Sequence, residues 1–216
     1  ATSEDDGSFS FENVPYGTWV IREIESPKGY VLSEEEIAVT IGKVDEVVEI
    51  ELVNYFIKGN IALTKVDEDY PDNKLSGAVF EVYSDTNGDG KLDKDDTLLG
   101  EMKELDGGVY QMSELRYGKY LVKETKAPTG FVLDENVYSV SVEENGKTYT
   151  VENKAGVGFI NAAQKGSLKI VKTSSDGKVE GFSFRVTGVD YDQTFKTDKN
   201  GEIVIEGMRI GDYTVS

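Results

Sequence analysis

The sequence predicts an all-β protein built from β-sandwich units that follow one another along the chain. Apolar and polar residues alternate over short segments, as in strands with one buried face. Turn dipeptides containing glycine separate these segments, and no segment keeps a convincing helical period beyond two turns. Short strands at this spacing favour a sandwich or a barrel. Blocks of sequence also recur, which indicates repeated units.

The repeats define a unit of about a hundred residues. YGTWVIREIESPKGYVL (16–32) aligns without a gap with YGKYLVKETKAPTGFVL (117–133), and the signature begins again at 210 as IGDYTVS. GNIALTKVD (59–67) matches GSLKIVKTS (166–174). We therefore expect residues 1–56 to be the C-terminal part of one unit, 57–163 a complete unit, and 164–216 the N-terminal part of a further unit.

Strands are expected wherever polar and apolar residues alternate. In chain order these segments are residues 8–14, 17–24, 46–53, 59–66, 77–83, 118–124, 137–144, 147–153, 166–172, 182–188 and 201–207. Tight turns are expected at Asp6-Gly7, Gly107-Gly108, Asn145-Gly146, Asp176-Gly177 and Asn200-Gly201.

The composition excludes several classes of function. The net charge is −18, so phosphate backbones and anionic membrane surfaces are poor partners. Because the chain has no His and no Cys, it has no His-based triad, thiol nucleophile, disulfide or Cys/His zinc site. Only hard, oxygen-binding cations remain as metals. We therefore expect that the protein is not an enzyme with turnover.

Targeting signals are not evident in this sequence. No apolar stretch approaches the roughly 20 residues that cross a bilayer. The first residues have neither the basic start nor the apolar core of a signal peptide, and the last residues contain no cell-wall sorting signal. The sequence is thus expected to be either cytosolic or an internal piece of a larger protein.

Three polar residues fall on core-facing positions of predicted strands in the complete unit: Lys65, Glu124 and Asn161. Side chains alternate between the faces of a strand, so each shares its face with two apolar residues. The apolar pairs are Ile61 with Leu63, Tyr120 with Val122, and Val157 with Phe159. An unpaired buried Lys or Glu costs several kcal/mol, so the pattern indicates that these groups are partners. The alternative is that each lies at a strand end and extends to water.

The chain resembles tandem CnaB-type domains, the prealbumin-like, immunoglobulin-like sandwiches of Gram-positive pilins and surface adhesins. The matching motifs are TKVDEDYPDNKLSGAVFEV (64–82), VKETKAPTGF (122–131) and GFIN (158–161). They cover the complete unit, and the flanking segments carry subsets of them. The resemblance implies tandem β-sandwiches arranged end to end.

The resemblance also implies a self-formed isopeptide bond. Lys65 corresponds to the nucleophile, Asn161 to the electrophile, and Glu124 to the acid that promotes the reaction. Glu23, Asn54 and Lys172 are the equivalents in the incomplete units. Their missing partners are expected in a longer parent chain; the alternative is that Lys172 of one molecule meets Glu23 and Asn54 of another.

Residues 85–96, DTNGDGKLDKDD, fit the spacing of an EF-hand calcium loop. The ligands expected from this spacing are the side chains of Asp85, Asn87, Asp89, Asp93 and Asp96 and the carbonyl of Lys91. The last ligand is Asp where the EF-hand pattern has Glu, and the segment before the loop reads as a strand. The sequence therefore predicts Ca²⁺ in the complete unit, with a solvated acidic hairpin as the alternative.

Two functions are compatible with these features. The first is a structural stalk or shaft module of a Gram-positive adhesin or pilin. Such a module would be extracellular, anchored to the cell wall through a segment outside this sequence, and in contact with neighbouring repeat domains. The second is an adhesin module that binds a host protein or glycan through its loops or an exposed sheet face. Neither function involves nucleic acid or insertion into a membrane.

Overall fold

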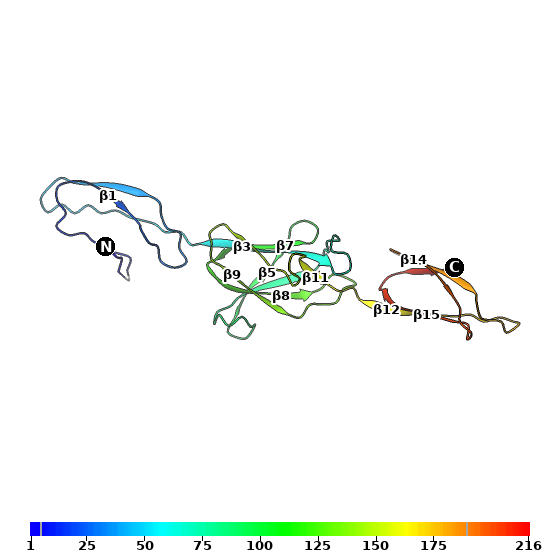
Figure 1. Ribbon diagram of the computed structural model, residues 1–216. Coiled ribbons are helices and arrows are strands. Elements are labelled where there is room, and N and C mark those ends of the chain that lie inside the picture. Colours follow the sequence, from blue (N-terminus) through cyan, green and yellow to red (C-terminus); the bar gives the residue numbers. More distant parts are fainter. Residues whose placement is uncertain (5, 189) are drawn as a thin grey trace.

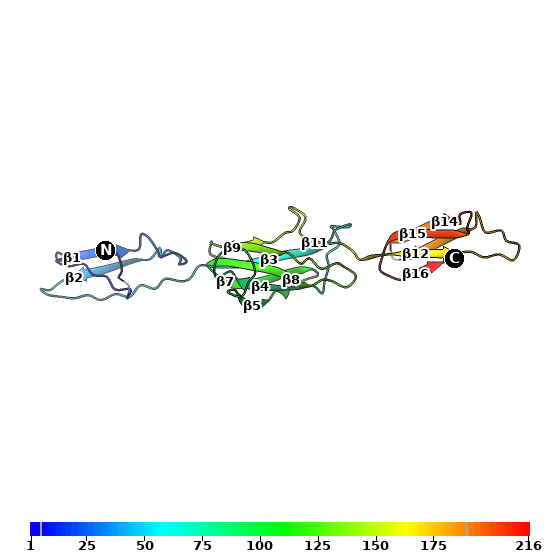
Figure 2. The same cartoon turned by 90° about the horizontal axis from the view of Figure 1, so that it is seen from below.

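The protein is an elongated chain of three β-rich bodies, and its computed structural model describes residues 1–4, 6–188 and 190–216. Both views show the bodies following one another end to end (Figures 1 and 2). We call them the N-terminal region (1–56), the central unit (57–163) and the C-terminal region (164–216). The described residues form strands, turns and loops, with no helix among them, so the all-β prediction is confirmed.

The N-terminal region contains β1 (Gly17–Arg22) and β2 (Glu36–Ile41). The strands of the central unit are β3 (Lys58–Asp67), β4 (Val79–Ser84), β5 (Thr97–Glu101), β6 (Lys103–Glu104), β7 (Val109–Arg116), β8 (Gly118–Lys126), β9 (Val137–Val142), β10 (Thr148–Thr150) and β11 (Phe159–Asn161). Those of the C-terminal region are β12 (Lys165–Val171), β13 (Ser183–Gly188), β14 (Tyr191–Lys196), β15 (Glu202–Arg209) and β16 (Tyr213–Val215).

The central unit is a sandwich of two sheets. One sheet has the order β10-β3-β7-β6, with β11 also paired to β3, and the other has the order β5-β4-β8-β9. All pairs are antiparallel except those of β3 with β10 and with β11. The fully buried core side chains include Ile61, Leu63, Phe80, Val82, Tyr110, Val122, Val142 and Phe159. The alternation in β3 and β8 thus predicted their buried faces correctly.

Two expected strands in the N-terminal region are absent: residues 8–14 and 46–53 are irregular. In the central unit, their counterparts by sequence order are β7 and the β10–β11 segment, and both of these pair with β3. Residues 1–56 as described hold no counterpart of β3, so these segments have no strand to hydrogen-bond with. Trp19, whose counterpart in the repeat is the buried Tyr120, is consequently 43% exposed.

Glycine allows the close approach on which β11 depends. Gly158 has φ of 130°, and a Cβ there would lie 2.8 Å from the carbonyl oxygen of Thr64 in β3. A side chain at this position would therefore push β11 away from β3. The expected glycine turns are also confirmed, since each of those dipeptides contains at least one glycine with positive φ.

An aromatic hydrogen bond recurs in all three bodies. The indole N–H of Trp19 donates to the carbonyl of Pro15 at 3.0 Å. In the same way the hydroxyl of Tyr120 donates to the carbonyl of Arg116 at 2.6 Å, and the hydroxyl of Tyr213 donates to the carbonyl of Arg209 at 2.8 Å. Each aromatic residue thereby fixes the turn that precedes its own strand. The repeats of the sequence are therefore repeats of local structure.

The two junctions between bodies have the same backbone arrangement. One linker residue, Ile57 at the first junction and Gln164 at the second, bonds both to the preceding and to the following body. The bonds are Ile57 N–H to Gly29 C=O (2.8 Å), Tyr117 N–H to Ile57 C=O (2.9 Å), Gln164 N–H to Gly130 C=O (2.8 Å) and Ile210 N–H to Gln164 C=O (3.0 Å). Each linker residue is thus held on both sides by backbone.

Side chains strengthen the second junction. Arg209 of the C-terminal region donates to both carboxylate oxygens of Asp67 in the central unit (2.6 and 2.8 Å) and to Asp69 (2.8 Å). Its guanidinium lies 4.8 Å from the ring centre of Tyr70, and Lys165 pairs with Asp69 at 3.1 Å. Asp67 is only 2% exposed, so this ion pair is partly sheltered from water.

Candidate functional site

The central unit brings Lys65, Glu124 and Asn161 together in its interior, and we call these three residues the reactive trio. They come from β3, β8 and β11 respectively. The parallel pairing of β11 with β3 places Phe159 opposite Lys65, so Asn161 follows two residues further on the same face. Lys65 and Glu124 are 0% exposed, and Asn161 is 3% exposed.

One carboxylate connects the trio. The Asn161 Nδ2 group lies 3.0 and 2.9 Å from the two carboxylate oxygens of Glu124, and the backbone N–H of Asp134 donates to Glu124 Oε2 at 2.8 Å. Lys65 Nζ is 4.0 Å from Glu124 Oε1 and donates to the carbonyl of Phe159 at 3.0 Å. Asn161 Oδ1 is buried and, among the described residues, has no hydrogen-bond partner.

Burial changes the ionisation of both titratable members. It lowers the pKa of the Lys65 amine to about 8, against the opposing effect of the Glu124 charge. It also raises the pKa of the Glu124 carboxyl, although the N–H of Asp134 and the amide of Asn161 favour the charged form. Both shifts favour neutral groups: an amine with a free lone pair and a carboxylic acid with a proton to donate.

Aromatic rings enclose the trio. The Lys65 amine lies 5.3 Å from the ring centre of Phe159, which packs edge-to-face against Phe80 and Tyr138 at 5.0 and 5.1 Å. These rings keep water from the amine and the amide. The arrangement therefore holds a nucleophile, an amide electrophile and an acid in a dry core, which is what an amine-for-ammonia exchange at the amide requires.

The N-terminal region contains an acid and an amide with matching contacts. Asn54 Nδ2 lies 2.8 Å from both carboxylate oxygens of Glu23, and the Ser33 N–H donates to Glu23 Oε2 at 2.8 Å. Unlike Glu124 and Asn161, Glu23 and Asn54 are only half-buried. Within the described chain no lysine joins them in a salt bridge or hydrogen bond.

Lys172, the expected lysine of the third unit, lies just after β12. Its amine donates to the carbonyl of Thr173 and sits 4.7 Å from the ring centre of Phe182. None of the described salt bridges includes it. The structure therefore brings Glu23 and Asn54 together and places Lys172 apart from them.

In the loop of residues 85–96, side-chain oxygens accept hydrogen bonds from the loop's own backbone. Asp85 accepts from Gly88 and Gly90 (2.7 and 3.1 Å), and Asp96 accepts from Thr86 and Asp93 (3.1 and 2.9 Å). Asn87 and Asp89 accept from the N–H groups two residues further on (3.0 and 2.8 Å), and Asp93 accepts from the N–H of Asp95 (2.8 Å) and from the side-chain amide of Asn87 (3.2 Å). Among the described residues, no three acidic side chains are grouped so as to hold a metal ion. Calcium binding by this loop stays a prediction from sequence.

Two residues next to the trio were missed by the sequence analysis: Asp134, whose N–H reaches Glu124, and Asn153, which bonds to the backbone of Ile160. The gapless repeat ends at Leu32 and Leu133, one position before Ser33 and Asp134; because these two residues differ, the repeat does not mark Asp134. No repeat or motif marks Asn153.

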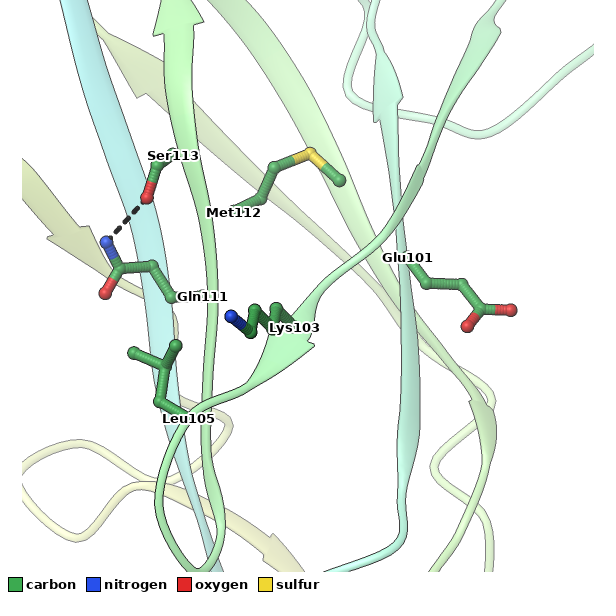
Figure 3. A pocket seen from close by; sticks show the side chains of 6 residues that line it. All are labelled: Glu101, Lys103, Leu105, Gln111, Met112 and Ser113. Carbon is green, nitrogen blue, oxygen red and sulfur yellow. Dashed lines mark hydrogen bonds between the residues drawn. The ribbon is translucent and has the colours of Figure 1, made fainter.

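A surface hollow of about 300 Å³ lies on the central unit between β5, β6 and β7. Its lining residues are Glu101, Lys103, Leu105, Gln111, Met112 and Ser113, and Figure 3 shows them spread along the strands around an open depression. The only hydrogen bond drawn among them joins Gln111 to Ser113 (2.8 Å). The hollow therefore offers little convergent polar chemistry for a ligand.

A family model described as the SpaA prealbumin-like fold domain matches residues 1–55, 59–155 and 166–216. The chain belongs to this family. It is similar in structure to the TIE protein of Bacillus anthracis, with 28% identity and a TM-score of 0.79 over 99% of this chain. Our chain spans 38% of that protein's chain. No curated protein sequence matches it.

Two pilins give weaker structural matches. The minor pilin of Streptococcus agalactiae has 24% identity and a TM-score of 0.37, covering 76% of this SpaA-family chain and 67% of the pilin. The shaft pilin SpaA of Lactobacillus rhamnosus GG has 16% identity and a TM-score of 0.39, covering 73% and 86%. The described residues include no helix long and apolar enough to cross a membrane.

Proposed function

We propose that this SpaA-family chain is a stalk or shaft module of a Gram-positive surface adhesin or pilin, closed in its central unit by a Lys65–Asn161 isopeptide bond. The observation that carries the proposal is the burial of an amine, an amide and a carboxyl group around one another, with no hydrogen-bond partner for the amide oxygen among the described residues. A buried Lys–Glu pair adds little stability by itself, because the cost of removing both groups from water can exceed their attraction.

The reaction is an exchange of ammonia for the lysine amine. Neutral Lys65 Nζ attacks Asn161 Cγ, and the Glu124 carboxyl, whose oxygens lie 2.9 and 3.0 Å from Asn161 Nδ2, acts as the general acid and base of the exchange. The Nζ–Cγ bond forms, a proton passes from Nζ through Glu124 to Nδ2, and the Cγ–Nδ2 bond breaks with release of ammonia. Glu124 ends with its proton restored, so the step happens once and needs no co-reactant.

The bond would make the central unit a closed loop. The chain enters the unit at β3 and leaves it after β11, and Lys65 and Asn161 lie on these two strands. Closing a loop of about 100 residues is worth roughly 4–5 kcal/mol in the chain-entropy model of crosslinks. A pulling force applied to both ends of the unit would pass through this covalent link rather than through the hydrogen bonds of the sheets.

The junctions support a load-bearing role. The linker residues are bonded to both neighbours, and Asp67, which anchors Arg209, lies only two residues beyond Lys65 on β3. The contact to the next body is therefore attached close to the proposed crosslink. Neighbouring repeat domains are the partners that this arrangement serves. We place the module outside the cell, on a protein held at the cell wall by another segment.

The test is the intact mass of the denatured protein. The wild-type chain is expected to weigh one ammonia less than its sequence predicts. Lys65→Ala and Glu124→Ala are each expected to restore the full sequence mass, whereas Glu23→Ala, which alters the similar site of the N-terminal region, should leave the loss unchanged. A wild-type mass equal to the sequence mass would refute the crosslink.

We further propose that the loop of residues 85–96 binds Ca²⁺, on the strength of its ligand spacing. Each loop carboxylate keeps lone pairs beyond those used by backbone N–H groups, so these hydrogen bonds do not block a cation. Saturating Ca²⁺ at about 100 times its Kd would raise stability by roughly 2.7 kcal/mol. Melting with Ca²⁺ and with a chelator should therefore differ in the wild type and coincide in Asp85→Ala, Asp89→Ala. Identical wild-type melting curves would leave the loop as an acidic hairpin.

A further inference from the structure

β11, the strand that carries Asn161, is held on one side by a side chain acting in place of a strand. β11 has only three residues and pairs with β3. The side chain of Asn153 bonds to both backbone groups of its middle residue: Oδ1 accepts from Ile160 N–H at 2.6 Å, and Nδ2 donates to Ile160 C=O at 2.9 Å. A carboxamide has the donor and acceptor of a peptide group, so Asn153 fixes the position of the residue that precedes Asn161.

Asp134 joins this clamp to the acid of the trio. Asn153 Nδ2 also donates to Asp134 Oδ2 at 2.8 Å, and Tyr138 O–H donates to the same oxygen at 2.7 Å. The backbone N–H of Asp134 donates to Glu124 Oε2. A continuous path of hydrogen bonds therefore runs from the strand of the electrophile, through Asn153 and Asp134, to the carboxyl of Glu124.

The Asp134 carboxylate is also a charge beside the trio. Burial raises its pKa, but the hydrogen bonds from Asn153, Tyr138 and Asn136 outweigh this and leave the pKa below its ordinary value, so Asp134 is ionised at neutral pH. Burial is the main cause of the raised pKa of Glu124, and the charge of Asp134 raises it further. Lys65 is faced by the charges of Glu124, Asp134 and Asp67, all of which oppose the lowering of its pKa by burial.

The N-terminal region lacks this network. There Ser33 occupies the place of Asp134 and keeps the N–H bond to the acid Glu23 but brings no charge. The amide of Asn54 donates to Glu23 and also to the carbonyl of Val31 at 3.3 Å. Val53 precedes Asn54 as Ile160 precedes Asn161, but no side chain in described residues 6–56 bonds to both backbone groups of Val53. The network is thus a feature of the central unit and not of every acid–amide pair.

We propose that Asn153 and Asp134 are positioning residues for the Lys65–Asn161 reaction. Asn153 holds the strand of the electrophile in register with Glu124, and Asp134 orients Asn153 and sets the charge around the acid. Neither residue makes or breaks a bond. This inference rests on the proposed crosslink. An error of about 1 Å in the position of a reacting group can slow a reaction about 100-fold. By holding β11 in place, Asn153 therefore keeps the reaction fast.

The test measures the rate of bond formation. The chain is recovered unfolded from inclusion bodies, refolded by dilution, quenched in denaturant at intervals, and weighed to follow the loss of ammonia. Asn153→Ala is expected to react about 10- to 100-fold more slowly than wild type. The matched control is Asn145→Ala, because Asn145 also accepts a backbone N–H, that of Lys58 (3.1 Å), at a turn distant from the trio. It should react at the wild-type rate.

A pH series separates positioning from charge. The rate should fall in acid as Lys65 stays protonated, and in alkali as Glu124 loses its proton. Asp134→Asn removes a negative charge that raises the pKa of both groups, so both limbs of its profile are expected to move to lower pH. Asn153→Ala should lower the rate at every pH without shifting either limb of the profile along the pH axis.

Each outcome has a separate meaning. Wild-type kinetics in Asn153→Ala together with an unmoved profile in Asp134→Asn would overturn this inference while leaving the crosslink in place. A wild-type chain that never loses ammonia would instead refute the proposed function. Folding is checked in the unreactive Glu124→Gln background, where Asn153→Ala must retain a cooperative melting transition. If it does not, the rate of Asp134→Asn and the displacement of its profile decide the question.

Discussion

The central unit and the N-terminal region contain the same acid–amide contact in two different environments. Asn161 meets Glu124 at 2.9 and 3.0 Å, and Asn54 meets Glu23 at 2.8 Å twice. In the central unit two sheets close over the contact and exclude water, and a lysine faces it. In the described part of the N-terminal region the strands are β1 and β2, which pair with each other, and the contact is half-buried.

The difference shows that hydrogen-bond geometry and reactivity are separate properties. The acid of each pair lies in the repeated motif YGxxxxxExxxPxGxVL and the amide lies outside it, yet the contact forms in both bodies. Making the amine a nucleophile and keeping the carboxyl protonated requires desolvation, which the second sheet supplies. We therefore expect substitutions in the central unit to have large effects and their counterparts in the N-terminal region to have small ones.

The largest difference is expected from the acids themselves. Glu124→Gln should abolish the crosslink and lower the free energy of unfolding of the central unit by roughly 4–5 kcal/mol, because the loop is no longer closed. Glu23→Gln should change that free energy by less than about 0.5 kcal/mol. Chemical denaturation of both variants measures the contrast. Equal losses would mean that the two contacts serve the same purely structural role.

Core aromatics provide the next contrast. Phe80 is 0% exposed and packs edge-to-face on Tyr110 and Phe159, so Phe80→Ala should cost about 3–5 kcal/mol. Trp19 is 43% exposed, so Trp19→Ala should lower the free energy of unfolding by less than about 1 kcal/mol, mostly through loss of the hydrogen bond to Pro15. Thermal melting of both variants is followed by circular dichroism and scanning calorimetry, because Trp19→Ala removes the single tryptophan of the chain. A large effect at Trp19 would indicate a core in the N-terminal region that the exposed fractions do not reveal.

A pH series tests burial of the amine directly. In Asn161→Ala, Lys65 stays a free amine with a folded-state pKa of about 8 against 10.5 in the unfolded chain. Between these values the unfolded state binds more protons, so stability should rise with pH across that window, by on the order of 1–3 kcal/mol. The control is Lys65→Met, Asn161→Ala, which lacks the titrating group. If the two variants show the same pH dependence from 8 to 10.5, the amine is not desolvated.

The smallest effect concerns the junctions. Arg209→Ala leaves buried Asp67 without its main partner and should destabilise the packing of the C-terminal region on the central unit by about 1–3 kcal/mol. Arg116 occupies the same place in the repeat but stacks on Phe56 at 3.9 Å, so Arg116→Ala should cost less. Small-angle scattering and melting of both variants would compare the junctions. A larger effect at Arg116 would reverse our ranking of them.

Much of this architecture can be predicted from the sequence, because the alternation of apolar and polar residues and the glycine turns are local signals. The faces of β3 and β8 followed from parity, and parity also singled out Lys65, Glu124 and Asn161. The strands expected at 8–14 and 46–53 are absent because a strand depends on a distant partner, which alternation does not reveal. The expected strands did not include β2, β5, β6, β7, β14 or β16. Except for β6, which pairs with β7, each of these is hydrogen-bonded to a strand that the alternation did predict.

Asn153 and Arg209 were beyond sequence reasoning for a different reason. Asn153 lies between β10 and β11, outside every motif that recurs in the sequence, so no repeat marks it. Arg209 meets Asp67 across a junction, with 141 intervening positions, and a charged residue on an acidic chain gives no sign of which carboxylate it will contact. Contacts of this kind depend on how whole units meet, and only the folded chain contains that information.

The doubly bonded linker residues, Ile57 and Gln164, determine how the protein's length scales. A flexible linker lets successive units orient independently, so the end-to-end distance grows only as about the square root of the number of units. Here one residue is hydrogen-bonded to the bodies on both sides, and no free linker separates them. Each additional unit then adds its full length, and the distance that such an array spans increases in direct proportion to the number of repeats.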